Sequence, residues 1–149
     1  MPTIKRRRTL RASDEEVWRV VSDPERLPGW WPLVTRVEEV GPDAWTEVLA
    51  SPRRKVVRAD FTLVESEPLR RRVWRQEVAE TPFERILAES TRMVELEPED
   101  EGSTSVAIAV RHRPRGWARL AFVQLRRATA RQVQEALDGL DALFGAGGD

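Results

Sequence analysis

The order of strand and helix patterns is the feature that most constrains how this chain can fold. Residues 33 to 112 carry one strand pattern after another, either rich in Val and Thr or alternating between apolar and polar residues, with turn residues such as Gly41 and Pro42 between them. The expected strands cover residues 33–40, 44–49, 55–66, 70–78, 83–98 and 104–112. Consecutive strands joined by short turns pair antiparallel. We therefore expect one antiparallel sheet, which an extended segment at residues 3–11 can join as a seventh strand.

A single long helical pattern follows the strands. From Gly116 onward, apolar residues recur every three or four positions, which predicts a helix over about residues 115–144. Leu125, Ala128 and Leu140 are expected to face the sheet. The apolar face of the sheet needs a cover, and this helix is the only element long enough, at roughly 45 Å. The sequence therefore predicts an α+β fold in which a curved sheet wraps around the helix, an arrangement that can leave a cavity between them.

Two short helices are predicted after the first strand. Ser13 and Glu16 form a capping-box pattern, in which each side chain bonds the backbone amide of the other residue. Apolar residues at helical spacing follow, so residues 14–22 are expected to be helical. Asp23 then caps a second helix, which has Pro24 at its first position.

Two adjacent tryptophans stand at a corner bounded by prolines. The second helix is expected to end before Pro28, and Trp30 and Trp31 follow directly, with Pro32 behind them. The pair could belong to the core, form the wall of a ligand pocket, or lie exposed as an adhesive patch. Each alternative implies a different function.

Composition excludes several classes of protein. The 149 residues fit one domain, expected over residues 1–149 with its core at 3–144 and a flexible tail at 145–149. The chain has no cysteine and a single histidine, His112, which excludes disulfides, thiolate zinc sites, a cysteine nucleophile and multi-histidine metal sites. No metal and no cofactor are expected.

Charge and hydropathy narrow the choice of partners and location. Basic and acidic residues balance at 25 each, which argues against nucleic acid as the partner. No apolar run approaches the ~18 residues of a membrane span, so no membrane span and a cytoplasmic location are expected. Arginine dominates the basic residues and asparagine is absent, a composition typical of a heat-adapted source or of a GC-rich genome.

The stretch ASDEEVWRVVSDPERLPGWWPLVTRVEEV, residues 12–40, resembles the opening of the START-like (SRPBCC) superfamily and, within it, the polyketide cyclase/dehydrase and lipid-transport group. The matching residues are Val17, Trp18, Ser22, Asp23, Pro24, Leu27, Trp30, Trp31 and Pro32. The stretch ELEPEDEGSTSVAI, residues 95–108, also resembles that group's penultimate hairpin. The resemblance implies the helix-grip fold over about residues 3–144. Members of the superfamily include carriers of hydrophobic ligands, aromatase/cyclases and domains with no known reaction.

The resemblance also bears on the tryptophan pair. It implies that the second short helix forms a lip over one end of the cavity. We expect one of Trp30 and Trp31 to seal the core and the other to line the pocket entrance, together with Phe61 or Trp74. The alternatives are that both rings only cap the core, or that they bind a partner.

Polar residues that share a strand face with apolar ones are the next candidates. Gln76, Ser90 and His112 have this pattern, and so does Arg92. A buried unpaired charge is costly, so Arg92 needs an internal carboxylate or an anionic ligand group. Otherwise it lies in water at the end of the sheet or pairs with an acidic neighbour such as Glu77. For His112 the alternative is a surface position at a strand end.

Three functions remain open. The leading hypothesis is binding of a small hydrophobic molecule such as a lipid, a polyketide or an aromatic compound. The second is a cyclase/dehydrase-type enzyme of the same fold, although no catalytic constellation is visible among Glu47, Asp60, Glu77 and Glu89. The third is a protein- or RNA-interaction module that uses basic stretches such as 5–8 and 70–72, which are expected on the outer face. The oligomeric state is left open. The expected pocket residues are Trp30, Trp31, Phe61, Trp74, Gln76, Ser90, Arg92, His112 and Leu125.

Overall fold

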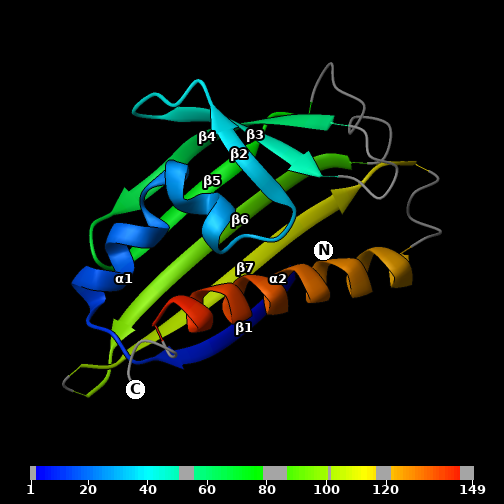
Figure 1. Cartoon of the computed structure of the whole chain (residues 1–149). Coiled ribbons are helices and arrows are strands. Elements are labelled where there is room, and N and C mark those ends of the chain that lie inside the picture. The colour runs from blue at the N-terminus through cyan, green and yellow to red at the C-terminus, as the bar shows by residue number, and fades with distance from the viewer. Residues whose placement is uncertain (1–2, 51–55, 79–86, 101, 117–121, 145–149) are drawn as a thin grey trace.

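The computed structural model describes residues 3–50, 56–78, 87–100, 102–116 and 122–144. Within these residues, seven strands and three helices follow one another (Figure 1). In order they are β1 (Thr3–Leu10), α1 (Asp14–Val21), the 3₁₀ helix η1 (Pro24–Gly29), β2 (Val34–Glu38), β3 (Ala44–Ala50), β4 (Val56–Glu67), β5 (Arg71–Gln76), β6 (Leu87–Pro98), β7 (Thr104–Pro114) and α2 (Phe122–Phe144). The expected tail at 145–149 and the start of the strand expected at 83–98 lie outside the described residues.

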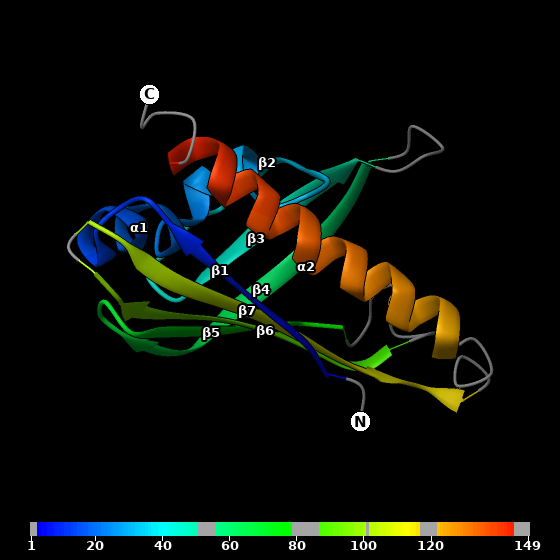
Figure 2. The ribbon, with the colours of Figure 1, turned by 90° about the horizontal axis from the view of Figure 1, so that it is seen from below.

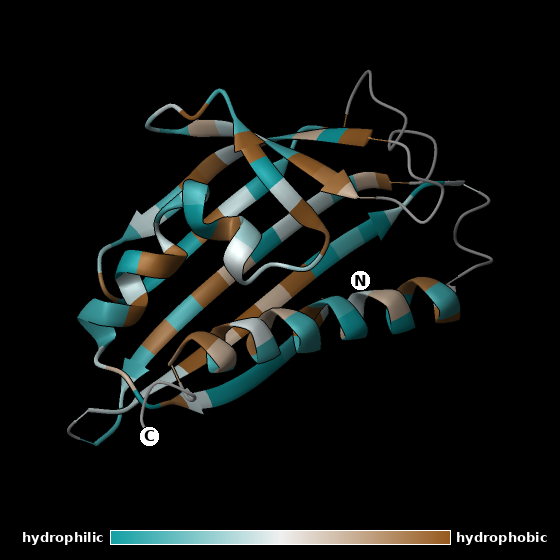
Figure 3. Ribbon diagram, in the orientation of Figure 1, coloured by the Kyte–Doolittle hydropathy of each residue, from teal (hydrophilic) through white to brown (hydrophobic). Residues whose placement is uncertain are grey.

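The strands form one antiparallel sheet in the order β1-β7-β6-β5-β4-β3-β2. The predicted α+β helix-grip architecture is therefore confirmed, with β1 joining β7 as the seventh strand. The helices α1, η1 and α2 lie on the same face of the curved sheet (Figures 1 and 2). Brown and teal bands alternate along the strands and along α2 (Figure 3), because only one side of each element faces the core that the sheet and the helices enclose.

The first helix begins at the predicted capping box. The Ser13 hydroxyl accepts a hydrogen bond from the Glu16 amide at 3.2 Å, and the Glu16 carboxylate accepts one from the Ser13 amide at 3.5 Å. These bonds satisfy backbone donors that have no partner within the helix. The helix α1 then buries Val17, Val20 and Val21 against the sheet, as the apolar spacing predicts.

The second helix differs from the prediction in length. Asp23 caps it and Pro24 stands at its start, as expected, but the 3₁₀ helix η1 continues through Pro28 to Gly29. The expectation that it ends before Pro28 is wrong. The Leu27 carbonyl accepts hydrogen bonds from the amides of Trp30 at 3.1 Å and Trp31 at 2.8 Å, so the turn closes without the amide hydrogen that proline lacks.

The helix α2 buries a narrow stripe against the sheet. Its buried residues are Thr129, Val133, Ala136, Leu137 and Leu140. Leu140 therefore faces the core as predicted, and Leu125 is half-buried, one turn before Thr129 on the same side. Ala128 is exposed, so its predicted orientation is wrong, because it lies about 100° around the helix from Thr129. The predicted first turn at 117–121 lies outside the described residues.

A glycine in α2 allows the helix to touch the tryptophan corner. A Cβ atom at Gly139 would overlap the carbonyl oxygen of Trp30 and lie 2.9 Å from its Cα. Both contacts are with backbone, which cannot rotate away as a side chain can. Gly139 therefore sets the distance between α2 and the corner that follows η1.

We predict that Gly139→Ala destabilises the protein by about 1–3 kcal/mol, the usual cost of overpacking, although Ala stabilises most helix interiors relative to Gly. The measurement is the free energy of unfolding in urea. Gly29→Ala is the matched control, since nothing lies within 4 Å of the added Cβ there. Equal stability of the two variants would contradict the close contact.

Candidate functional site

A row of polar side chains crosses the inner face of the sheet. Phe61 of β4 pairs with Gln76 of β5, and Ser90 of β6 pairs with His112 of β7. The register that pairs Arg75 with Thr91 also brings Gln76 beside Ser90. Four neighbouring strands thus place predicted pocket residues at one level of the sheet. Gln76 and Ser90 are buried, and His112 is half-buried.

Arg92 lies two residues beyond Ser90 and is paired inside the protein. Its Nη1 donates to Glu47 of β3, with distances of 3.0 Å to Oε1 and 3.3 Å to Oε2. Arg92 is 5% exposed and Glu47 is fully buried. The indole of Trp45 also donates to Glu47 Oε2, at 3.2 Å. Glu47 is therefore an internal carboxylate of the kind that the sequence analysis requires.

The alternative partner of Arg92 does not contact it. Glu77 is exposed, and it accepts hydrogen bonds from Thr62 at 2.9 Å and Arg75 at 3.5 Å. Sequence reasoning did not single out Glu47 as the partner, although it shares a strand face with Trp45. That shared face is the signal that could have marked it as inward-facing.

Two aromatic rings enclose the Arg92 guanidinium. Its Cζ lies 4.4 Å from the ring centroid of Phe61 and 4.6 Å from that of Trp31. Both contacts are of the cation–π type, which stabilises a cation removed from water. Trp74 pairs with Arg92 across β5 and β6. Its ring lies edge-to-face with that of Trp31, with 6.0 Å between the ring centroids. Aromatic contacts and one carboxylate thus hold the buried charge in place.

The two tryptophans of the corner are both buried, and their rings meet edge-to-face at 5.4 Å. They have different neighbours. The Trp31 ring covers Arg92, whereas the Trp30 backbone lies against Gly139 of α2. The pair therefore joins the charged centre of the sheet to the long helix.

A groove of about 420 Å³ opens beside His112. Its lining residues are Pro32, Leu33, His112, Leu125, Ala128, Thr129, Arg131, Gln132 and Glu135. The groove thus lies between the end of β7, the segment after the tryptophan pair and the first half of α2. Its size falls within the range of small-molecule sites. His112 and Leu125, two of the predicted pocket residues, line it, and His112 links it to the polar row.

Burial lowers the pKa of His112 to about 4, and the positive charge of Arg92 contributes to the same shift. The imidazole is therefore neutral at pH 7. Arg92 and Glu47 compensate each other's charge at the inner end of the site.

Several buried polar atoms of this region have no hydrogen-bond partner among the described residues. They are Nε1 of Trp30, Trp31 and Trp74, Nε2 of Gln76, Oγ of Ser90, Nε of Arg92 and Nδ1 of His112. Buried polar groups in folded proteins are nearly always satisfied. A concentration of unsatisfied groups at one place indicates a site suited to a polar group of a ligand or to ordered water.

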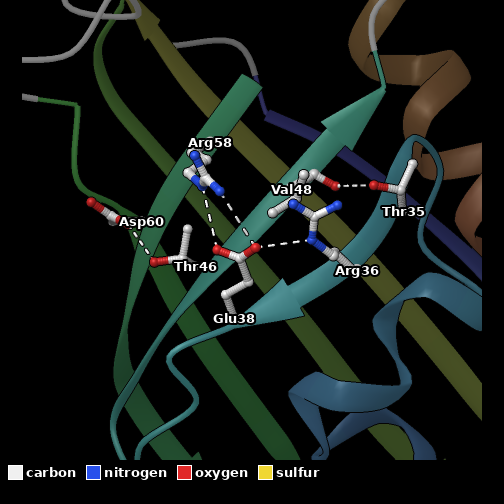
Figure 4. Close-up of polar contacts among 7 residues, drawn as sticks. All are labelled: Thr35, Arg36, Glu38, Thr46, Val48, Arg58 and Asp60. Atoms are coloured by element: carbon white, nitrogen blue, oxygen red, sulfur yellow. Dashed lines mark hydrogen bonds and ion pairs between the residues drawn. The ribbon is translucent and has the colours of Figure 1, made fainter. Parts of the chain in front are cut away.

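The outer face of the sheet has a separate polar network (Figure 4). The Glu38 carboxylate accepts hydrogen bonds from Arg36 at 2.9 Å and from Arg58 at 3.3 Å, and the two guanidinium groups lower the pKa of Glu38. Thr46 donates to Asp60 at 2.6 Å, and Thr35 donates to the carbonyl of Val48 at 3.0 Å. Asp60 is thereby held away from the Arg92 site.

The other acidic candidates also lie away from that site. Glu89 is half-buried and lies 3.8 Å from Arg113. In the part of the chain that the structure describes, no three His, Cys, Asp or Glu residues gather in a way that could hold a metal ion. Nor is any helix of that part long and apolar enough to cross a membrane.

The basic stretch at residues 5–8 is largely paired with acidic residues. In residues 5–8, Lys5 lies 3.4 Å from Glu95, Arg7 lies 3.6 Å from Glu97, and Arg8 lies 2.7 Å from Asp138. Such pairing leaves little uncompensated charge in that stretch for a polyanion.

Arg72 corrects the prediction that residues 70–72 face outward. It is 8% exposed, and its guanidinium lies 5.7 Å from the ring centroid of Trp45. Burial lowers its pKa, and Asp23 and Asp43 oppose that shift. Arg72 shares the inner face with Trp74, two residues further along the strand.

Solved structures share this architecture. A START superfamily protein of Mycobacterium smegmatis has a TM-score of 0.63 and 13% identity, with 89% of this chain and 96% of that chain covered. A protein of Thermus thermophilus has a TM-score of 0.74 and 20% identity, with 95% of each chain covered. The sheet closed over one long helix is therefore the helix-grip fold of START-like proteins.

The di-domain ARO/CYC protein BexL of the BE-7585A biosynthetic pathway is also similar, with a TM-score of 0.79 and 21% identity. That match covers 95% of this chain but 46% of BexL, so the chain spans less than half of that protein. No curated protein sequence matches the chain. The sequence profile of the family described as polyketide cyclase / dehydrase and lipid transport matches residues 1–145, and the chain belongs to that family.

We predict that breaking the Arg92–Glu47 pair is more damaging than removing it. Glu47→Leu or Arg92→Met alone leaves a buried charge without its partner and should lower the free energy of unfolding by about 3–5 kcal/mol. The double variant should be more stable than either single variant, because no charge remains to be desolvated. Urea unfolding of the three variants measures this coupling, and simple additivity of the two single losses would contradict it.

We predict a second effect from His112. Its folded pKa of about 4 lies below the ordinary value of 6.5, so between these values the unfolded chain binds a proton that the folded protein does not. Stability is therefore lost as the pH falls from about 6.5 toward 4. Between pH 7.5 and 5.0 the loss from this group is about 2 kcal/mol.

The measurement is urea unfolding of the wild type and His112→Gln at both pH values. The variant should lose less stability on acidification by about that amount, whereas carboxylates that titrate in the same range affect both proteins equally. An identical pH dependence of the two proteins would show that His112 is not buried as described.

Proposed function

We propose that the protein binds a small, largely apolar molecule whose body occupies the groove beside α2 and whose inner end reaches the polar row on the sheet. The observation that carries this proposal is the arrangement at His112. This residue lines the groove of about 420 Å³ and stands in the row that leads through Ser90 to Gln76. A mostly apolar groove with a few convergent polar groups is the usual form of a small-molecule site.

The family supports the proposal in general terms, since its description combines polyketide cyclases and dehydrases with lipid transport. The expected ligand class is therefore a lipid, a polyketide or another aromatic molecule. We include Trp31, Phe61 and Trp74 in the site because they enclose or adjoin Arg92. Trp30 acts at the corner, where it supports Trp31.

The chemistry of the site favours a carrier over an enzyme. A general base is most effective when its pKa lies near the working pH, and the pKa of His112, at about 4, is far below neutrality. Arg92 and Glu47 are bonded to each other at 3.0 Å and serve as a fixed structural pair. We therefore assign the site to binding, with cyclisation or dehydration as the alternative that turnover assays would reveal.

We predict that the neutral fluorescent probe N-phenyl-1-naphthylamine binds the groove and that Leu125→Ala weakens its binding by about tenfold, the equivalent of losing part of one buried leucine contact. The matched control is Val123→Ala, an exposed position two residues away on the same helix. Fluorescence titration gives both affinities. Equal weakening by the two substitutions, or no saturable binding to the wild type, would reject the groove as the site. Native mass spectrometry of protein purified from its own host then identifies the natural ligand.

A further inference from the structure

We propose that the ligand presents a neutral hydrogen-bond acceptor, a carbonyl oxygen of an aldehyde, ketone, ester or amide, to the inner end of the site, and that a carboxylate is disfavoured there. This inference rests on the proposed binding function and specifies the polar group that the site selects.

The unpartnered nitrogen atoms around Arg92 are all hydrogen-bond donors. Nε1 of Trp31, Nε1 of Trp74 and Nε of Arg92 are buried without a partner among the described residues, and all three can only donate. They belong to one cluster, because the Trp31 ring covers the Arg92 guanidinium at 4.6 Å and meets Trp74 at 6.0 Å. A carbonyl oxygen, with two lone pairs, can accept hydrogen bonds from two such donors.

The polar row extends this cluster toward the groove. Gln76 Nε2 is a fourth unpartnered donor, and the Ser90 hydroxyl and His112 Nδ1 are also buried without partners in the described chain. The row runs from Gln76 through Ser90 to His112, which lines the groove. A ligand in the groove therefore contacts apolar side chains such as Leu33 and Leu125, and it reaches the row at His112.

The charges around Arg92 also favour a neutral ligand group over a carboxylate. Both oxygens of Glu47 lie within 3.3 Å of Arg92 Nη1, so the positive charge is already compensated, and the imidazole beside it is neutral at pH 7. An added carboxylate would bring an uncompensated charge into a buried site, which is far more costly than burying a neutral carbonyl group that finds donors. A pocket with an unpaired cation would bind a carboxylate more tightly than a neutral carbonyl group. This site is expected to bind the carbonyl group more tightly.

Three compounds with one ring system test the inference: 2-acetylnaphthalene, 2-ethylnaphthalene and 2-naphthoate. Each displaces N-phenyl-1-naphthylamine from the wild-type protein at pH 7.5, and its affinity follows from the displacement curve. The ketone should bind about fivefold more tightly than the hydrocarbon, the equivalent of one net hydrogen bond, and the carboxylate should bind more weakly than the hydrocarbon. The ketone is the less hydrophobic of the two neutral compounds, so a purely apolar pocket gives the reverse order.

Two substitutions connect the preference to the donors. Gln76→Met removes the amide at similar volume, and Trp31→Phe removes the indole N–H. Each should bring the ketone-to-hydrocarbon affinity ratio close to one while the hydrocarbon still binds. Gln124→Met, at an exposed position of α2, should leave the ratio unchanged. If one of the site variants fails to fold, the other variant still gives the ratio.

The outcomes separate the two proposals. A ketone preference that either site variant removes and the control retains supports the inference. Binding of the hydrocarbon and the ketone with equal affinity, tightest binding of the carboxylate, or a ratio that neither variant changes overturns the inference and leaves the binding function standing. Failure of the probe and all three compounds to bind overturns both.

Discussion

The pair of Arg92 and Glu47 is the contact on which the interior of this protein depends. The two residues belong to β6 and β3, which are separated in the sheet by β5 and β4. In a flat sheet these strands would lie about 14 Å apart, yet the side-chain atoms meet at 3.0 Å. The ion pair therefore forms across the hollow of a curved sheet, and Phe61, on a strand between them, closes one face of the guanidinium.

The buried positive charge of Arg92 also explains the position of the tryptophan pair. Burying an arginine is costly unless neighbouring groups compensate its charge, and Glu47 lies on only one side of the guanidinium. Trp31 supplies a second face, and it can reach Arg92 because η1 turns the chain back over the sheet through the two amide bonds to the Leu27 carbonyl. Trp30 then meets the backbone side of Gly139. One buried cation thus ties together the strand interior, the second short helix and the long C-terminal helix.

The parts of this structure that follow from local physical chemistry could be predicted from the sequence. The antiparallel sheet follows from short turns between strands, and the start of α1 follows from Ser13 and Glu16. The inward-facing set of Gln76, Ser90 and Arg92 follows from alternation along single strands.

What sequence reasoning missed depends on tertiary contacts. The partner of Arg92 lies three strands away, a separation that alternation along one strand does not encode. Arg72 is expected on the outer face because charge runs are usually solvated, whereas the ring of Trp45 and the acids Asp23 and Asp43 make the inner face acceptable to it. Ala128 and Thr129 are adjacent in the helical pattern, and only the docking of α2 decides which of them is covered.

The contact between Gly139 and Trp30 holds α2 against the tryptophan corner close to the C-terminal end of the helix. Leu125, which lines the groove, stands 14 residues away, a distance of about 21 Å along the helix axis. If α2 were rotated by about 5° around Gly139, Leu125 would move by about 2 Å, whereas the backbone at Gly139 would hardly move. A small difference in the angle of α2 at this contact would therefore change the width of the groove far more than it changes the contact itself.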